Sequence, residues 1–413
     1  MTKTVYILGA GANQSVEAWG GLKPPMAENF FQLALQSNEF AAVHDTGRIQ
    51  PVFDFIANNF NRSELQLKNE PFDLEKLFTV LDLRQDDMRE HDQERFIELW
   101  RISFLLKSFF AEFLNSFETH AAGDLVTRAL GRIIQSDHAS VLTFNYDCIL
   151  ECGLESAAGV RSGPYPHPHQ RPELTDAGLA YSHYYWNRPL GYGFKFSEIE
   201  LQQAGPRRYV DGERFYGIPS NALYDTPVLK LHGSLNWFRF LPIRRFPDLP
   251  GDSPLVLPES RRDAIVLLRG HWWLSEPPDL DGWFMDPILV TPVLNKQPLL
   301  ADPPFPRIWE DARKKLADCQ RLIVVGYSFP PTDFHAEDLL RRAYQSGPPE
   351  EVILVNPDQD GRVAKTILEL TRASALTASF SSVEDYVRSI GGADDPTIPG
   401  HSINPYEPLP STD

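Results

Sequence analysis

Five short apolar runs, each followed directly by small or polar residues, constrain the fold of this chain more than any other feature. The runs are Thr4–Leu8, Ser140–Phe144, Pro227–Leu231, Arg321–Val325 and Glu351–Val355. The sequences that follow them are GAGA, NYD, HGS, GYS and NPD, in that order. Runs that are apolar throughout are typical of strands buried on both faces of a parallel sheet. Helical patterns between later runs therefore predict an α/β fold with a doubly wound parallel sheet.

The segment between the first two runs, at about 26–136, predicts a large helical insertion. Its apolar residues recur at helical spacing over Phe72–Leu83, Glu94–Phe117 and Asp124–Gln135. The many aromatic residues of the second helix are interpreted as core packing. A further strand of the parallel sheet is expected at Pro287–Thr291.

Two other segments, at about 157–225 and 241–285, are rich in proline and lack periodicity, which predicts irregular loop insertions. We expect one domain over residues 1–390, followed by a flexible tail at 391–413.

Charge and cysteine content narrow the function classes. The chain has 413 residues and a net charge of −17, which argues against direct binding to nucleic acid or to anionic membranes. It carries no apolar run near the length of a membrane span and no signal-peptide pattern, so a cytoplasmic location is expected. Three cysteines cannot build a four-cysteine zinc site, and no metal is expected.

Because the carboxyl ends of parallel strands meet at one edge of a sheet, the five polar segments are expected to lie together. Gly9 and Gly11 would let a phosphate approach the backbone, although Gln14 replaces the third glycine of a dinucleotide fingerprint. A tight turn is the alternative interpretation. His232 is either a general base or a histidine bonded within the core. Asn145 and Asp147 should face the same way, with Tyr146 packed against the fold.

The motifs together resemble those of the sirtuin-like superfamily, and most closely its bacterial NAD-hydrolase branch found in anti-phage defence systems. The resemblance is carried by GAGA, GLKPP at Gly21–Pro25, TFNYD at Thr143–Asp147, LHGSLNW at Leu231–Trp237, VVGYSFPPTD at Val324–Asp333 and VNPD at Val355–Asp358. Pro292 and Lys296 also resemble a proline-then-lysine segment of that branch.

The resemblance implies a Rossmann-like fold that binds NAD+ and cleaves its nicotinamide–ribose bond. It implies that Asn145 orients water or the ribose hydroxyls, that Asp147 holds the nicotinamide end, and that His232 is the catalytic base. The residues implied to contact the rest of NAD+ are Gly9, Ala10, Gly11 and Ala12 at the diphosphate, Gly326 and Ser328 along the phosphate and ribose path, and Asn356 at the adenosine ribose.

The implied function is an NAD+ hydrolase that depletes NAD+ during phage infection, as a homo-oligomer or with a partner such as a HerA-like ATPase. Lysine deacylation is disfavoured, because classical deacylases carry a four-cysteine zinc module that this chain lacks. The alternatives are a non-catalytic NAD sensor or assembly subunit and an ADP-ribosyltransferase.

Overall fold

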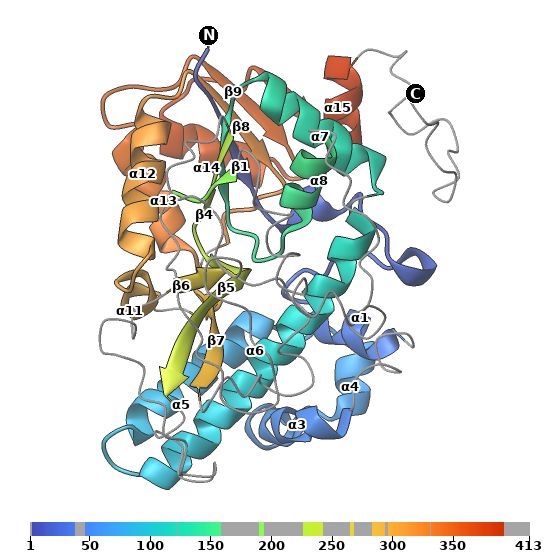
Figure 1. Cartoon of the computed structure of the whole chain (residues 1–413). Coiled ribbons are helices and arrows are strands. Elements are labelled where there is room, and N and C mark those ends of the chain that lie inside the picture. Colours follow the sequence, from blue (N-terminus) through green and yellow to red (C-terminus); the bar gives the residue numbers. More distant parts are fainter. Residues whose placement is uncertain are drawn as a thin grey trace, which may run out of the picture.

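A parallel sheet of seven strands lies in the upper half of the molecule as drawn in Figure 1. The computed structural model describes residues 2–37, 46–121, 123–157, 190–193, 226–242, 265–267, 283–293, 296–330 and 332–391. In the order in which they lie side by side, the strands are β10 (Ala378–Phe380), β9 (Glu351–Val355), β8 (Arg321–Val325), β1 (Thr4–Leu8), β2 (Ser140–Thr143), β4 (Thr226–Lys230) and the two-residue β3 (Leu190–Gly191). The five apolar runs of the sequence thus form β1, β2, β4, β8 and β9, which confirms the expected parallel sheet.

The direction in which the sheet grows changes between β1 and β8. From β1 the chain adds β2 and then β4 on one side, and β8, β9 and β10 follow on the other side. Tyr6 in β1 lies opposite both Val141 of β2 and Ile323 of β8. The loop that follows β1 therefore lies at a topological switch point, where open α/β sheets commonly bind their ligands.

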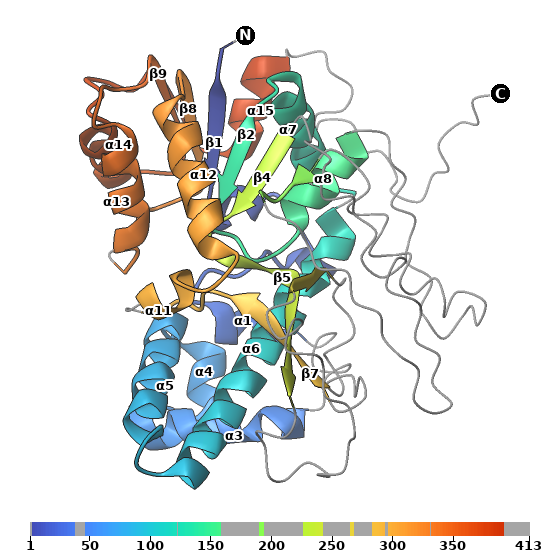
Figure 2. The ribbon, with the colours of Figure 1, turned by 60° about the vertical axis from the view of Figure 1, so that its left-hand side comes forward.

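Helices cover both faces of the sheet (Figure 2). One layer consists of α7 (Leu125–Ser136), α8 (Ile149–Ala157) and α15 (Val383–Gly391), and the other of α12 (Phe305–Ala317), α13 (Phe334–Ala343) and α14 (Arg362–Thr371). Between the layers every residue of β1 is buried, as is every residue of β2. Burial on both faces explains why these strands are apolar without alternation.

A lobe made mostly of helices lies beyond the carboxyl edge of the sheet (Figure 2). It contains α1 (Phe30–Gln36), α3 (Thr46–Phe60), α4 (Glu64–Asn69), α5 (Leu74–Met88) and the long α6 (Gln93–Ala121). The ring of Phe30 lies 5.5–5.7 Å from the rings of Phe109, Phe110 and Phe113 of α6. The aromatic stripe predicted in the sequence therefore is core packing at these three positions. The helices expected at Phe72–Leu83, Glu94–Phe117 and Asp124–Gln135 correspond to α5, α6 and α7.

A second, antiparallel sheet joins this lobe. Its strands are β6 (Ile265–Leu267), β5 (Gly233–Pro242) and β7 (Trp283–Leu289), in that spatial order. The prediction that Pro287–Thr291 extends the parallel sheet is wrong, because β7 pairs with β5 in the antiparallel sense. An apolar run shows that a strand forms, but it does not show which sheet the strand joins.

The segments predicted to be irregular, at about 157–225 and 241–285, lie mostly outside the described residues. The described parts form β3 within the first segment, and the end of β5, β6 and the start of β7 within the second, so neither segment is wholly irregular. The tail at 392–413 also lies outside the described residues. None of the helices in the described ranges has both the length and the apolar composition that crossing a membrane needs.

The turns after β1 and β8 pack against each other backbone to backbone. The amide of Gly9 donates to Val325 O over 3.0 Å, and the amide of Gly11 donates to Gly326 O over 2.9 Å. Gly326 has a φ of +60°, and a Cβ atom there would lie 2.1 Å from the amide nitrogen of Ala12. A side chain at Gly326 would push the two turns apart.

We expect Gly326→Ala to destabilise the fold by about 3 kcal/mol, because it adds a clash to the cost of a left-handed alanine. Gly361→Ala is the matched control: its φ is +70°, and nothing lies within 4 Å of the added Cβ. This control should cost only about 1 kcal/mol. Urea unfolding of both variants measures the difference, and equal losses would show that contact between the turns contributes nothing.

Candidate active site

Several backbone amides of the loop after β1 already donate hydrogen bonds within the protein. Besides the amides of Gly9 and Gly11, the amide of Ala12 donates to Gly9 O over 2.9 Å. Ala10 is exposed, whereas Ala12 is buried. These amides are therefore bonded within the protein, and Gly9 and Gly11 are required by the contact with the β8 turn. What the loop offers a ligand is a surface almost free of side chains.

Asn145 and Asp147 both bind the loop after β1, as their spacing predicts. The amide Nδ2 of Asn145 donates to Gly9 O over 3.0 Å. The carboxylate Oδ2 of Asp147 accepts from Asn13 Nδ2 over 2.9 Å. Tyr146 points elsewhere, since its hydroxyl donates to Val290 O over 2.7 Å. Residues on alternate sides of an extended segment separate in this way, so the predicted orientation of these three side chains is confirmed.

Protein donors occupy both oxygens of Asp147. In addition to Asn13, the amide of Ile149 at the start of α8 donates to Oδ1 over 3.0 Å. Burial raises the pKa of Asp147, and the nearby Lys230 opposes that rise. A buried carboxylate with both oxygens bonded is suited to fixing the loop between β2 and α8.

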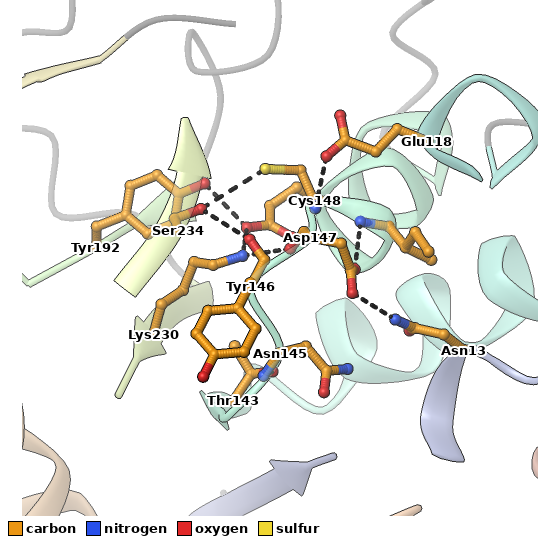
Figure 3. A network of polar contacts seen from close by, with 12 residues as sticks. Asn13, Glu118, Thr143, Asn145, Tyr146, Asp147, Cys148, Tyr192, Lys230 and Ser234 are labelled. Carbon is orange, nitrogen blue, oxygen red and sulfur yellow. Dashed lines mark hydrogen bonds and ion pairs between the residues drawn. The ribbon is translucent and has the colours of Figure 1, made fainter. Parts of the chain in front are cut away.

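A network of buried polar side chains lies behind that loop (Figure 3). Lys230, fully buried in β4, is 2.9 Å from Glu151 Oε1 and also donates to the carbonyl of Asp147. The hydroxyl of Tyr192 donates to the same Glu151 oxygen over 3.0 Å. The carboxylate of Glu118 on α6 accepts from the amide of Cys148 over 3.0 Å. These contacts tie β4, α8 and α6 to the loop that carries Asn145.

His232 lies directly after β4, beside the loop that carries Asn145. Its ring is 5.1 Å from that of Phe144 and 6.1 Å from that of Tyr146, and the side chain is only 7% exposed. Burial lowers the pKa of His232, and Asp333 opposes that decrease without reversing it. His232 is therefore neutral at pH 7, which is the state a general base requires.

Asp333, from the loop before α13, faces His232. Its Oδ2 lies 3.5 Å from His232 Nε2 and accepts from the hydroxyl of Tyr327 over 2.5 Å. Its Oδ1 lies 3.0 Å from Lys296 Nζ. Burial alone would raise the pKa of Asp333, but its interactions with His232, Lys296 and the Tyr327 hydroxyl hold it below its usual range. Asp333 is thus an anion, and because His232 is neutral, Lys296 balances its charge.

The helical lobe contributes one carboxylate to the same place. Glu75 on α5 accepts from the hydroxyl of Thr332 over 2.6 Å, across a sequence separation of 257 residues. Burial raises the pKa of Glu75, and Thr332 and Lys296 oppose that rise. The lobe is therefore bonded to the loop that carries Asp333.

The remaining predicted residues lie on the β8 and β9 side of the edge. Asn356 donates from Nδ2 to Tyr327 O over 3.4 Å and from its backbone amide to Phe380 O over 2.9 Å. Ser328 and Gly326 are half-buried on the turn after β8. Asn356 therefore joins the turn after β8 to the end of β9.

The structure thus brings all five predicted segments to one edge of the sheet and links them through hydrogen bonds. Asn145 and His232 lie on neighbouring segments, with the Asn145 amide turned to the β1 loop and the His232 ring between Phe144 and Tyr146. Sequence reasoning named neither Asp333, Lys296 nor Glu75 as a site residue. The first two fall within segments that carried the resemblance, whereas Glu75 is one acidic residue among many on a helix.

No protein-family model matches the chain, and no match is found among curated proteins. In the parts of the chain that the structure describes, no three His, Cys, Asp or Glu side chains are grouped so that they could hold a metal ion.

We expect Lys230→Met to destabilise the fold by about 3–5 kcal/mol, because it leaves the Glu151 carboxylate buried without its cation. The double variant Lys230→Met with Glu151→Gln should recover more than half of that loss. Lys3→Met is the control: it breaks an exposed pair with Asp318 and should cost under about 1 kcal/mol. Guanidinium unfolding measures all three, and a double variant as unstable as the single one would contradict this account.

Proposed function

We propose that this protein is an NAD+ glycohydrolase that releases nicotinamide and ADP-ribose from NAD+. The observation that carries the proposal is the position of Asn145 and His232 on adjacent segments beside the glycine loop of β1, at the switch point of the sheet. The strand order supports a Rossmann-like fold, in which a dinucleotide lies across this point. The resemblance of the motifs to sirtuin-like NAD hydrolases supplies the substrate.

The proposed reaction is hydrolysis of a glycosidic bond. Departure of nicotinamide leaves positive charge on the ribose, and a water oxygen bonds to the same carbon. His232, neutral and buried, accepts the proton that the attacking water or a ribose hydroxyl releases. The side-chain oxygen of Asn145 is suited to orienting that water, because its Nδ2 is already bonded to Gly9 O. The products are nicotinamide, ADP-ribose and one proton.

Contacts in the structure refine the roles that the resemblance implies. Asp147 acts as a positioning residue rather than a nicotinamide contact, because protein donors already bind both of its oxygens. Gly9, Ala10, Gly11 and Ala12 contribute a surface that a diphosphate can approach closely. Gly326 and Ser328 would line its path, and Asn356 would reach the adenosine ribose.

The biological role follows from the same resemblance. We propose a cytoplasmic effector that depletes NAD+ during phage infection and that acts as a homo-oligomer or with a partner such as a HerA-like ATPase. Oligomerisation or a partner would keep such an activity silent until infection.

We expect His232→Ala and Asn145→Ala each to lower the rate of nicotinamide release by at least about 100-fold while the fold is retained. The controls are His91→Ala, at an exposed position, and Asn69→Ala, whose side chain donates to Leu65 O within α4. Chromatography of nicotinamide and ADP-ribose after incubation with NAD+ measures the rate, and circular dichroism checks folding.

Full turnover in both site variants would refute the assignment. Binding of NAD+ without nicotinamide release, with and without candidate activators, would instead indicate a sensor or assembly subunit. Transfer of labelled ADP-ribose to a macromolecule would indicate a transferase.

A further inference from the structure

The Nε2 nitrogen of His232 faces the carboxylate of Asp333. Nε2 is buried, lies 3.5 Å from Asp333 Oδ2 and makes no well-aligned hydrogen bond. Long contacts of this kind are common in unliganded active sites and shorten in the complex with substrate. Since a carboxylate only accepts protons in hydrogen bonds, a charged Asp333 favours the tautomer that carries its proton on Nε2. The lone pair then lies on Nδ1.

The side chain of Asp333 does not form the helix-capping hydrogen bond that its place in the sequence would allow. It stands at the N-cap of α13, where an aspartate normally accepts from the first backbone amides of the helix. No such bond forms, and the carboxylate instead faces Tyr327, Lys296 and His232. Only 2% of its side chain is exposed. The side chain of Asp333 is therefore held by Tyr327, Lys296 and His232, and it makes no hydrogen bond to α13.

We propose that Asp333 is the positioning residue for His232: it holds the ring proton on Nε2, so that Nδ1 accepts a second proton during cleavage. The positive charge of Lys296 opposes the effect of Asp333 on the ring. The proposed role of Nδ1 in cleavage rests on the proposed function. The tautomer of His232 and the charges that act on the ring can be measured without NAD+.

The charged groups around His232 come from several elements and act in opposite directions. Asp333 favours protonation of the ring, whereas Lys296 before α11 (Gln297–Leu300) and His335 on α13 disfavour it. The carboxyl group of Glu75 on α5 interacts electrostatically with Lys296 and Asp333. The hydroxyl of Tyr146 is turned away from the ring and donates to Val290 O. Removing Asp333 or Lys296 must therefore move the pKa of His232 in opposite directions, which a purely structural role for either residue would not do.

The test uses Asp333→Asn and Lys296→Met in the full chain labelled with 15N-histidine. His232 is assigned by comparison with His232→Gln. Without NAD+, we expect the wild-type ring to be protonated on Nε2 when neutral. The pKa of His232 should fall by about one unit in Asp333→Asn and rise by about one unit in Lys296→Met.

Turnover provides the second measurement. A base must be neutral, so activity rises with pH through the pKa of His232. The acidic limb of kcat should move to lower pH in Asp333→Asn and to higher pH in Lys296→Met. We expect kcat on the plateau of Asp333→Asn to fall by roughly 100-fold, with KM little changed.

Controls separate this role from damage to the fold. Asp338→Asn and Lys314→Met remove exposed charges of the same kinds, on α13 and α12, and should leave both measurements unchanged. If either single variant is unstable because one buried charge remains alone, the double variant Asp333→Asn with Lys296→Met removes both charges. It should keep the loss of kcat and lose the preference for Nε2–H.

A neutral His232 protonated on Nδ1, or pKa shifts of the same sign in the two variants, would overturn the inference. The expected tautomer and opposite shifts in a protein that releases no nicotinamide would leave the Asp333–His232 pair established and refute the proposed function instead.

Discussion

The contact between the turns after β1 and β8 determines how the rest of the carboxyl edge is arranged. Gly11 donates to Gly326 O, and a Cβ on Gly9, Gly11 or Gly326 would lie within 3 Å of backbone in the opposite turn. Because this contact fixes the position of Gly9 O, it also fixes the acceptor that Asn145 binds. A glycine-rich loop at a switch point usually suggests a bound phosphate, yet here the glycines are first explained by the meeting of two turns.

Buried charge is the second organising feature of this edge. Lys230 pairs with Glu151 on one side of the Asn145 loop, and Lys296 pairs with Asp333 beyond His232. Taking such groups out of water is costly, and loss of one partner leaves the other charge buried alone. Each also joins elements far apart in the sequence: β4 to α8 in the first case, and the start of α11 to the loop before α13 in the second. The residues that would react are therefore held by electrostatic links as well as by the sheet.

Features that a short stretch of sequence determines could be predicted, whereas features that depend on pairing between distant residues could not. The strands and their polar ends could be predicted, because an apolar run that stops at Gly9 or at Asn145 is visible in a few residues. The antiparallel β7 was assigned to the wrong sheet, since its partner β5 is about 50 residues away in sequence. Asp333 stands at the N-cap of α13, and only the folded chain shows that it faces His232. No sequence pattern marks Glu75 as a site residue, because its hydrogen-bond partner Thr332 is 257 residues away.

The balance of charge around His232 is suited to the proton transfer that we propose. With His232 neutral, the charge of Asp333 is opposed by that of Lys296, whose Nζ lies 3.0 Å from Oδ1. Taking a proton onto the ring creates one positive charge in a medium of low polarity, where it is expensive unless an anion lies nearby. Asp333 Oδ2 is 3.5 Å from the ring and provides that anion, while Lys296 limits how strongly it holds the proton. Burial of the ring and the charge of Lys296 both favour the neutral histidine and so oppose the carboxylate.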